Sequence, residues 1–295
     1  MEIKLAKEMG FCFGVRKAIE LVEKEATTRV NPSITTYGSL VHNPVVNEKM
    51  ESLGVTVNNR NMPAVATRTI AFTAHGIAPQ IVEQAQAQEL EILDATCPLV
   101  TLIQQSAMEM IKEGFFVIVY GDKNHVEVQS IVGWAITAGG EKNVISTKDF
   151  NDIKDMRPPK RIGIVCQSTS ILKEFKEFVL QVHEHFLGKT KEIKVHNTIC
   201  APTTRLQTSA EELAQECQVM VVIGGKQSAN TQHLADLCRE NGATTYKIER
   251  ANELDPSWFE GIETVGVTAG ASTPDESIEE VVASLKSFDL LKSKN

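Results

Sequence analysis

The chain has 295 residues, 42% of them hydrophobic, and its 30 basic and 38 acidic side chains give a formal net charge of −8. This length permits one to three domains with large buried cores, whereas the acidic balance and the lack of dense Lys or Arg runs exclude a typical nucleic-acid-binding protein. Apolar runs such as residues 115–120 are too short to span a bilayer, and residues 1–12 lack the pattern of a signal peptide, so we expect a cytoplasmic protein that does not bind membranes.

Six times along the chain, a short β-branched apolar run is followed by a polar or glycine-bearing turn and then by a segment of helical composition. The turns occupy residues 35–44, 72–80, 119–128, 165–170, 222–233 and 267–275. Apolar runs without alternation are typical of buried parallel strands, and the sequence Thr273-Pro274-Asp275 is a helix start signal. The repetition therefore predicts an α/β fold with mostly parallel sheets.

The six units could form one doubly wound sheet, or they could pair into three small lobes. Cys12, Cys97 and Cys200 favour the lobes, because they divide the chain into successive pieces that each hold two units. Three lobes around a shared centre would bring these cysteines together with loops at the carboxyl ends of strands, where α/β proteins bind ligands. We predict lobes at residues 13–96, at residues 97–196, and at residues 1–12 together with 197–295.

The cysteine pattern indicates a possible metal site but does not establish one. Six cysteines in a chain of this length do not suggest a disulfide framework, and no CxxC pair occurs. The three cysteines named above lie in loop-like segments with Gly or Pro nearby, which suits presentation of a thiolate, although buried cysteines are more often inert packing. Cys217 and Cys238 are expected in helices of the core, and Cys166 is expected to pack at a strand end, near the site or away from it.

Three of the seven histidines occupy turns after predicted strands, and their shared position indicates convergence on one pocket. They are His42, His75 and His125. A lone turn histidine is usually a surface residue, but imidazoles can also be metal ligands, proton carriers or anion binders. The later turns supply hydroxyls and an amide from Ser168, Thr169, Ser228, Asn230 and Ser272. Together with N–H groups at helix starts, this inventory suits a diphosphate, whereas neither a P-loop nor a GxGxxG motif is present.

Glu127, two residues beyond His125, is the candidate acid. If its side chain points into the same cavity, burial raises its pKa and suits it to proton delivery. The alternative is an exposed acidic residue that interacts favourably with the dipole at a helix start. The periodicity of the sequence leaves both interpretations open.

In this order, the motifs resemble the family of 4-hydroxy-3-methylbut-2-enyl diphosphate reductases. The resemblance runs from Gly10 to about Ser284 and rests on GFCFGV, YGSLVHNP, AHG, DATCP, NHVEV, QST, NTICAPT, SAN and TAGAS. It implies three similar α/β lobes around a central [4Fe–4S] cluster with one open iron, whose three thiolate ligands would be Cys12, Cys97 and Cys200. It also implies reductive removal of the allylic hydroxyl, which gives isopentenyl diphosphate and dimethylallyl diphosphate.

The resemblance further implies a role for each candidate residue. The substrate diphosphate would be held by His42, His75, His125, Ser228, Asn230 and Ser272. Glu127 would deliver protons to the substrate, while Ser168 and Thr169 would orient its hydroxyl and relay protons. A ferredoxin or a flavodoxin would supply the electrons, and a monomer is expected.

Four positions depart from the family pattern and keep other functions open. Ala229 stands where a second serine is common, Val126 where proline is usual, Gln129 where an acidic residue is common, and Ser168 where threonine is usual. A paralogue with the same cluster could therefore act on another phosphorylated allylic compound. A non-catalytic iron–sulfur sensor is a further alternative, against which retention of Glu127 argues. A structural zinc protein with Cys3His ligation would be colourless, whereas an iron–sulfur protein would be brown.

Overall fold

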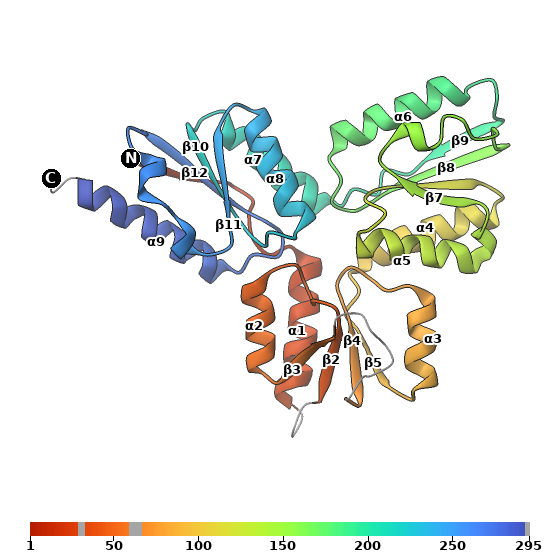
Figure 1. Ribbon diagram of the computed structural model, residues 1–295, viewed down its shortest axis with the longest axis horizontal. Helices are drawn as coiled ribbons and strands as arrows, with labels where there is room; N and C mark the ends of the chain where they lie inside the picture. The colour runs from red at the N-terminus through yellow and green to blue at the C-terminus, as the bar shows by residue number, and fades with distance from the viewer. Residues whose placement is uncertain (29–32, 59–66, 293–295) are drawn as a thin grey trace. The chain divides into compact units, whose positions relative to one another are not determined.

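A computed structural model describes residues 1–28, 33–58 and 67–292 (Figure 1). The strands in this part of the chain are β1 (Glu2–Leu5), β2 (Ile34–Tyr37), β3 (Val55–Asn58), β4 (Thr69–Phe72), β5 (Glu91–Asp94), β6 (Phe116–Tyr120), β7 (Val144–Thr147), β8 (Arg161–Cys166), β9 (Glu192–Val195), β10 (Val219–Ile223), β11 (Thr244–Ile248) and β12 (Thr264–Ala269). The α-helices are α1 (Phe13–Thr28), α2 (Pro44–Ser52), α3 (Pro79–Ala87), α4 (Pro98–Lys112), α5 (Val126–Ala135), α6 (Leu172–Phe186), α7 (Ala201–Ala214), α8 (Ala229–Glu240) and α9 (Asp275–Lys292). A π-helical turn, η2 (Ile136–Gly140), extends α5, and short 3-10 turns are η3 (Phe150–Asp152), η4 (Ala251–Glu253) and η5 (Pro256–Phe259). No helix in these ranges combines the length and the apolarity that crossing a bilayer requires.

The strands form three parallel four-stranded sheets that share one strand order. The orders are β3-β2-β4-β5, β7-β6-β8-β9 and β11-β10-β12-β1. In the third sheet, β1 takes the place of a fourth strand by pairing with β12, so that Glu2 lies opposite Thr264 and Leu5 opposite Val267. The predicted α/β fold with three similar parallel parts is confirmed, and the single doubly wound sheet is wrong.

The chain divides into two compact units. Unit 1 comprises Met1–Arg16, Val41–Ser52 and Ala201–Asn295, and unit 2 comprises Lys17–Leu40 and Leu53–Cys200. Unit 1 contains the sheet β11-β10-β12-β1, and unit 2 contains the other two sheets. Helix α2 belongs to unit 1, although its place in the sequence is between two strands of unit 2. The residue limits predicted for three lobes stay a prediction.

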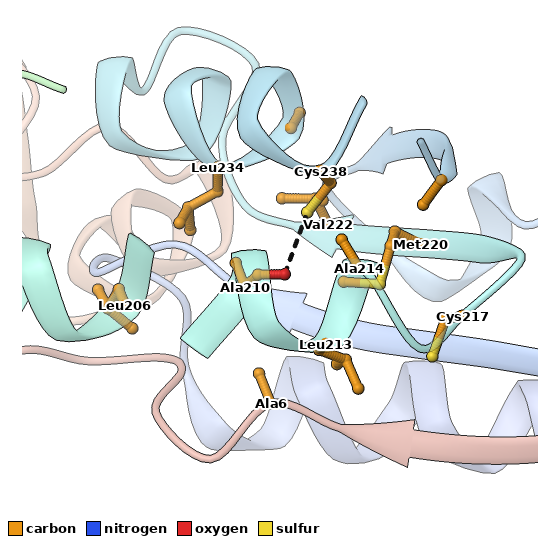
Figure 2. Packing of buried hydrophobic residues seen from close by; sticks show 12 residues of the cluster. Ala6, Leu206, Ala210, Leu213, Ala214, Cys217, Met220, Val222, Leu234 and Cys238 are labelled. Atoms are coloured by element: carbon orange, nitrogen blue, oxygen red, sulfur yellow. Dashed lines mark hydrogen bonds between the residues drawn. The ribbon is translucent and has the colours of Figure 1, made fainter. Parts of the chain in front are cut away.

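The sheet of unit 1 has helices on both faces. Every residue of β10 is buried, as a strand covered on both sides requires. Alternate side chains point to opposite faces: Met220 and Val222 pack under α7 and α8, as Figure 2 shows, while Val221 packs on the face covered by α9. Cys217 and Cys238 belong to the first of these cores, which confirms their predicted burial, although Cys217 lies beyond the end of α7 and not in a helix.

The sheet β7-β6-β8-β9 of unit 2 is covered in the same way. Helices α4 and α5 pack on one face and α6 on the other. Helix α6 buries Phe175, Phe178, Val182 and Phe186 at intervals of three or four residues, which gives it one continuous apolar face. Each such side chain contributes about 1.5–3 kcal/mol when fully buried. The sheet β3-β2-β4-β5 has a smaller core, built around Ile70 and Phe72 with α3.

The two central strands of each sheet are the six strands that the sequence predicted before polar turns. If β1 is counted as the fourth strand of its sheet, they are the first and third strands of each sheet along the chain. They are β2 and β4, β6 and β8, and β10 and β12. Because parallel strands end at the same edge of a sheet, the two turns of each sheet lie together at its carboxyl edge, where ligands bind in α/β folds. The candidate residues in these turns therefore lie on two neighbouring loops at the carboxyl edge of each sheet.

Candidate active site

The three predicted cysteine ligands occupy the same place in each sheet. Each lies between the fourth strand of a sheet and a helix. Cys12 follows β1 and directly precedes α1, Cys97 follows β5 and directly precedes α4, and Cys200 follows β9 and directly precedes α7. The backbone N–H of each cysteine donates a 3.0 Å hydrogen bond to a carbonyl two residues beyond the third strand, with Ala271, Ala74 and Ser168 as the respective acceptors. The segments predicted to be loop-like are thus helix starts, each tied by its backbone to the neighbouring turn.

This position suits cysteines that bind a metal as thiolates. A helix N-terminus stabilises negative charge, and iron–sulfur clusters are held by cysteine thiolates. These three cysteines are half-buried, whereas Cys166, Cys217 and Cys238 are buried. Cys12 belongs to unit 1, and Cys97 and Cys200 belong to unit 2. Over the described ranges, no group of three or more Cys, His, Asp or Glu side chains is placed so that it could hold a metal ion.

A second repeat follows the first strand of each sheet. Five residues beyond β2, β6 and β10 lie His42, His125 and Ser228, respectively. His125 is the N-cap of α5 and Ser228 the N-cap of α8. Two residues further on lie Glu127 and Asn230, which therefore hold equivalent positions in the first turns of the two helices.

Glu127 is the buried acid of unit 2. Its side chain is 2% exposed, so the interpretation as an exposed residue at a helix start is wrong. One carboxylate oxygen accepts the Ser168 backbone N–H at 2.6 Å, and the other accepts the Ser168 hydroxyl at 2.8 Å. Burial raises the pKa of Glu127 from 4.5 to about 7, against the opposing effect of these two hydrogen bonds. A carboxyl group of this kind holds a proton near neutral pH and can donate it.

Two of the predicted histidines lie together in unit 2. The rings of His75 and His125 are 5.6 Å apart in an edge-to-face arrangement. His75 Nδ1 lies 3.4 Å from the Thr73 hydroxyl, and His125 Nδ1 accepts the backbone N–H of Glu127 at 3.2 Å. A neutral His125 ring then carries its proton on Nε2, where it can donate to an anion. The structure therefore brings His75, His125 and Glu127 to one edge of unit 2.

Thr169 and Cys166 flank Ser168 in the turn after β8. The Thr169 hydroxyl accepts a 3.3 Å hydrogen bond from the Gln167 amide. Cys166 is fully buried, and its sulfur accepts the Thr198 backbone N–H at 3.3 Å. Cys166 packs in the core of the sheet β7-β6-β8-β9, as predicted, at the end of the strand that leads to Ser168.

Unit 1 contributes three buried polar residues whose side chains suit a polar ligand. Ser228 caps α8 by accepting the Thr231 N–H at 3.3 Å. Both side-chain atoms of Asn230 and the hydroxyl of Ser272 are buried, and they have no hydrogen-bond partner among the described residues. Buried polar atoms in native proteins are nearly always paired. An oxygen-rich ligand such as a diphosphate would supply the missing partners.

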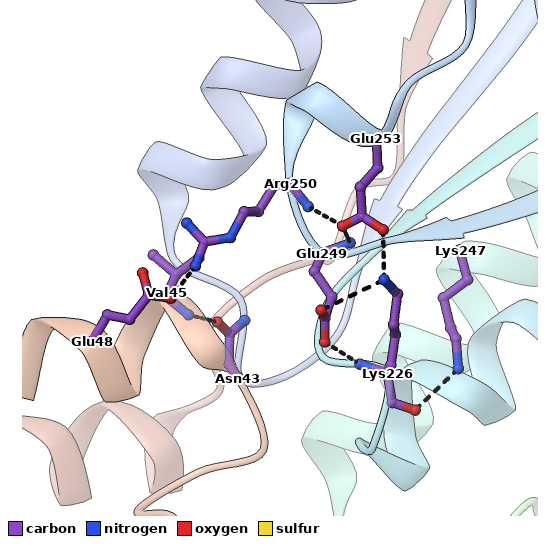
Figure 3. Close-up of polar contacts among 8 residues, drawn as sticks. All are labelled: Asn43, Val45, Glu48, Lys226, Lys247, Glu249, Arg250 and Glu253. Atoms are coloured by element: carbon purple, nitrogen blue, oxygen red, sulfur yellow. Dashed lines mark hydrogen bonds and ion pairs between the residues drawn. The ribbon is translucent and has the colours of Figure 1, made fainter.

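His42 lies beside the loop that leads to Ser228. A Cβ placed on Gly225 would stand 2.0 Å from the His42 carbonyl oxygen, so the two backbones approach too closely for any side chain at that position. Figure 3 shows how the surrounding loops are joined: Lys226 pairs with Glu253 at 2.7 Å, and Arg250 pairs with Glu48 of α2. His42 thus belongs to the same compact unit as Ser228, Asn230 and Ser272.

Asn43 is a residue that the sequence analysis did not identify. It is 2% exposed, and its Oδ1 accepts the Val45 N–H at 2.9 Å at the start of α2, which fixes the backbone next to His42 (Figure 3). The signal was present in the sequence, because Asn followed by Pro44 is a typical helix start.

These features define a parallel α/β protein with cysteines at three equivalent helix starts and a buried carboxyl group near two histidines. Comparison with known proteins specifies the class further. The model of the family described as LytB protein matches residues 3–286, and the chain belongs to this family.

Three of the similar curated proteins are named 4-hydroxy-3-methylbut-2-enyl diphosphate reductase. A protein from Dehalococcoides mccartyi is 39% identical over 288 residues, covering 98% of this chain and 99% of the relative. A protein from Geobacter sulfurreducens is 41% identical over 293 residues, covering 98% of each chain. A protein from Aquifex aeolicus is 38% identical over 281 residues, covering 95% of this chain and 94% of the relative.

Two solved structures have the same fold. One is (E)-4-hydroxy-3-methyl-but-2-enyl diphosphate reductase, described as the terminal enzyme of the non-mevalonate pathway, with a TM-score of 0.70 and 36% identity over 97% of this chain and all of that chain. The other is E-1-hydroxy-2-methyl-but-2-enyl-4-diphosphate reductase from Plasmodium falciparum, with a TM-score of 0.88 and 28% identity over 95% of this chain and 86% of that chain. Membership of this family implies an iron–sulfur protein.

Proposed function

We propose that this protein reduces 4-hydroxy-3-methylbut-2-enyl diphosphate to isopentenyl diphosphate and dimethylallyl diphosphate. The allylic C–O bond breaks, the oxygen leaves as water, and two electrons and two protons are taken up. The observation that carries the proposal is the buried Glu127 carboxyl beside the His75–His125 pair, in a chain whose relatives bear the name of this reductase. These names support the reductase over the paralogue and the sensor.

Glu127 is the proposed proton donor to the leaving oxygen. Its pKa of about 7 leaves a substantial part of the carboxyl groups protonated at neutral pH, which is the condition for a general acid. Ser168 holds both carboxyl oxygens, so the acid has one orientation. Ser168 and Thr169 are proposed to orient the substrate hydroxyl and to relay protons, because both hydroxyls lie in the turn that holds Glu127.

The substrate diphosphate is proposed to bind to the histidines and to the polar residues of unit 1. The proposed contacts are His42, His75, His125, Ser228, Asn230 and Ser272. The buried and unpaired atoms of Asn230 and Ser272, counted over the described residues, support this assignment. The N-terminal ends of α5 and α8 add N–H groups and a positive end of a helix dipole, both of which favour phosphate oxygens.

Cys12, Cys97 and Cys200 are the proposed ligands of a [4Fe–4S] cluster with one open iron. When bound, such a cluster supplies electrons one at a time and a Lewis acid at its open iron. The chain fits this group, because the three half-buried cysteines recur at equivalent helix starts. We further propose a ferredoxin or flavodoxin as the electron donor, a monomer as the working form, and the cytoplasm as its location.

Anaerobic turnover tests the proposal. Reconstituted protein would be mixed with reduced viologen dye and 4-hydroxy-3-methylbut-2-enyl diphosphate, and the products would be identified by mass spectrometry. We expect both five-carbon diphosphates to form over many turnovers, in amounts well above the concentration of protein. Absence of both products from protein with intact iron and sulfide content would refute the proposed reaction.

A further inference from the structure

Helix α5 carries His125 at its N-terminus and also contacts the loop that carries His75. Ser130, Gly133 and Trp134 lie four, seven and eight residues beyond Val126, the first residue of the helix, and this spacing places them on one face. That face packs on the segment that runs from His75 to the start of α3, as the hydrogen bonds and close contacts below establish.

Two side chains of α5 bind one carbonyl of the His75 loop. The Trp134 indole N–H donates to the Ile77 carbonyl at 2.9 Å, and the Ser130 hydroxyl donates to the same oxygen at 3.3 Å. The Gln104 amide of α4 donates to the Ser130 oxygen at 2.6 Å. Ser130 and Gln104 are 1% and 6% exposed, so water does not readily replace these bonds and their loss leaves buried polar groups unpaired.

Two glycines bring the loop and the helix unusually close. Gly76 has a φ of +79°, and a Cβ on it would lie 2.6 Å from the Gln104 amide nitrogen and 2.8 Å from the Ser130 hydroxyl. A Cβ on Gly133 would lie 2.9 Å from the Cβ of Ala78. The loop therefore contacts α5 directly, and the contact begins at Gly76, the residue that follows His75.

Packing does not fill all of the space between the loop and α5. A pocket of about 190 Å³ borders this contact, and its lining includes Thr73 and Ile77 from the loop and Val126, Gln129 and Ser130 from α5. A side chain that faces such a space lacks contacts there and resists displacement less than one in a filled core. The position of His75 relative to His125 thus depends on the hydrogen bonds at Ile77 as well as on the close packing at Gly76 and Gly133.

We propose that Ser130 and Trp134 are positioning residues that fix the separation of His75 and His125 by holding the Ile77 carbonyl against the face of α5. The inference rests on the proposed function, because it takes these histidines as ligands of the substrate diphosphate. Neither residue touches the substrate in this proposal. Their effect should therefore appear in the binding of the diphosphate and much less in the chemical step.

The kinetic test compares Trp134→Phe and Ser130→Ala with a matched control. The chain has two tryptophans, and Trp258, which stacks on Tyr246 in unit 1 at 4.0 Å, gives the control Trp258→Phe. We expect roughly a fivefold to tenfold rise in KM for each of the first two variants, because each loses one hydrogen bond to the Ile77 carbonyl, with kcat changed less than twofold. Trp258→Phe should match the wild type in both constants.

A second measurement follows the indole itself. In the ¹⁵N-labelled, reconstituted wild type, the two indole N–H signals are assigned from the two tryptophan variants, and inorganic pyrophosphate is then added. We expect the chemical shift of the Trp134 indole signal to change and that of Trp258 to remain the same. Pyrophosphate bound between the histidines would displace the His75 loop, whose Ile77 carbonyl accepts the Trp134 hydrogen bond. In Ser130→Ala, which keeps the indole, the same shift should require several times more pyrophosphate.

The outcomes separate this inference from the proposed function. Unchanged KM values in folded Trp134→Phe and Ser130→Ala, beside a normal wild type, would overturn the positioning role and leave the reaction intact. An unmoved Trp134 signal at saturating pyrophosphate would overturn it as well. A wild type that shows the shift at Trp134 but forms no product would instead contradict the proposed reaction while supporting the positioning role.

Discussion

Glu127 is the residue whose surroundings differ most from those of an ordinary carboxyl group. It is almost completely buried, and among the described residues Ser168 is the hydrogen-bond donor to both of its carboxylate oxygens. The desolvation of the charged form outweighs these bonds, so its pKa rises to about 7. This balance leads to two predictions about pH.

The first prediction concerns turnover. Because the proposed reaction uses the protonated carboxyl, kcat/KM should fall about tenfold per pH unit above pH 7 and level off below it. Glu127→Gln should keep the iron and the brown colour but lose most turnover, together with this pH dependence. Anaerobic rates between pH 5.5 and 9 would be measured for both proteins; full activity in the variant would remove Glu127 from the reaction.

The second prediction concerns stability. Between its ordinary pKa of 4.5 and about 7, folded Glu127 holds a proton that the unfolded chain has released. The contribution of this group to the free energy of unfolding therefore falls as pH rises through that window. Glu127→Gln removes the titration, so its stability relative to the wild type should rise by up to roughly 3 kcal/mol from pH 4.5 to pH 8. Denaturant unfolding of both proteins across this range measures the difference; a constant difference would contradict the raised pKa.

Cys97 gives a prediction about iron. It is the N-cap residue of α4, it is half-buried, and it is a proposed cluster ligand. Cys97→Ser should therefore lose most of its iron, while the fold survives. Cys217→Ser is the matched control, because Cys217 is buried in the core of unit 1 and is not a proposed ligand. Iron and sulfide would be assayed after identical reconstitution. Equal iron in the wild type and Cys97→Ser would contradict the ligand assignment.

At the scale of elements, the start of α2 illustrates which polar contacts stabilise a helix. Asn43 is 2% exposed and its Oδ1 accepts an N–H at the helix start, whereas the Glu48–Arg250 ion pair is formed by side chains that are 58% and 40% exposed (Figure 3). A buried cap has little competition from water, while an exposed ion pair is screened by it.

We therefore expect Asn43→Ala to lower the free energy of unfolding by about 1 kcal/mol or more. Glu48→Gln, the matched change one turn further along the same helix, should lower it by less than about 0.5 kcal/mol. Urea unfolding at two salt concentrations would measure both, and only the effect of Glu48→Gln should depend on salt. The reverse order of the two effects would contradict this account.

At the scale of the whole molecule, the N-terminal strand completes the sheet formed by the C-terminal third of the chain. Among the described strands β1 pairs with β12 alone, and Ile3 packs on the core that also contains Val265 and Val281. The two ends of the sequence must therefore meet before this sheet is complete. Such a contact between distant segments forms at a larger loss of chain entropy than a local one.

Ile3→Ser should consequently loosen unit 1 and leave unit 2 unchanged. We expect faster amide hydrogen exchange in β10, β11 and β12, and unchanged exchange in β6 and β8. Leu5→Ser, in the same strand at a side chain that is 48% exposed, is the matched control and should have a smaller effect. Exchange that accelerates equally in both units would contradict the division of the chain into two compact units.

The amino-acid sequence was enough to predict the parallel α/β class, the six strands before the polar turns, and the set of candidate residues. These follow from local signals, because strands buried on both faces are continuously apolar and helix starts carry Pro, Ser, Asn and Asp. The short edge strands were not predicted. Strands such as β1, β5 and β9 are half-exposed and carry charged residues, so their composition does not separate them from loops.

Three features became known from the folded structure alone: the burial of Glu127, the equivalence of the three cysteine positions, and the assignment of α2 to unit 1. None of these is a local property. Glu127 has the same neighbours in sequence whether it faces water or Ser168, and the segment Val41–Ser52 gives no sign of the contacts that Gly225 and Arg250 make with it. Such features depend on contacts between residues that are far apart in the sequence, and these contacts exist only once the sheets have formed.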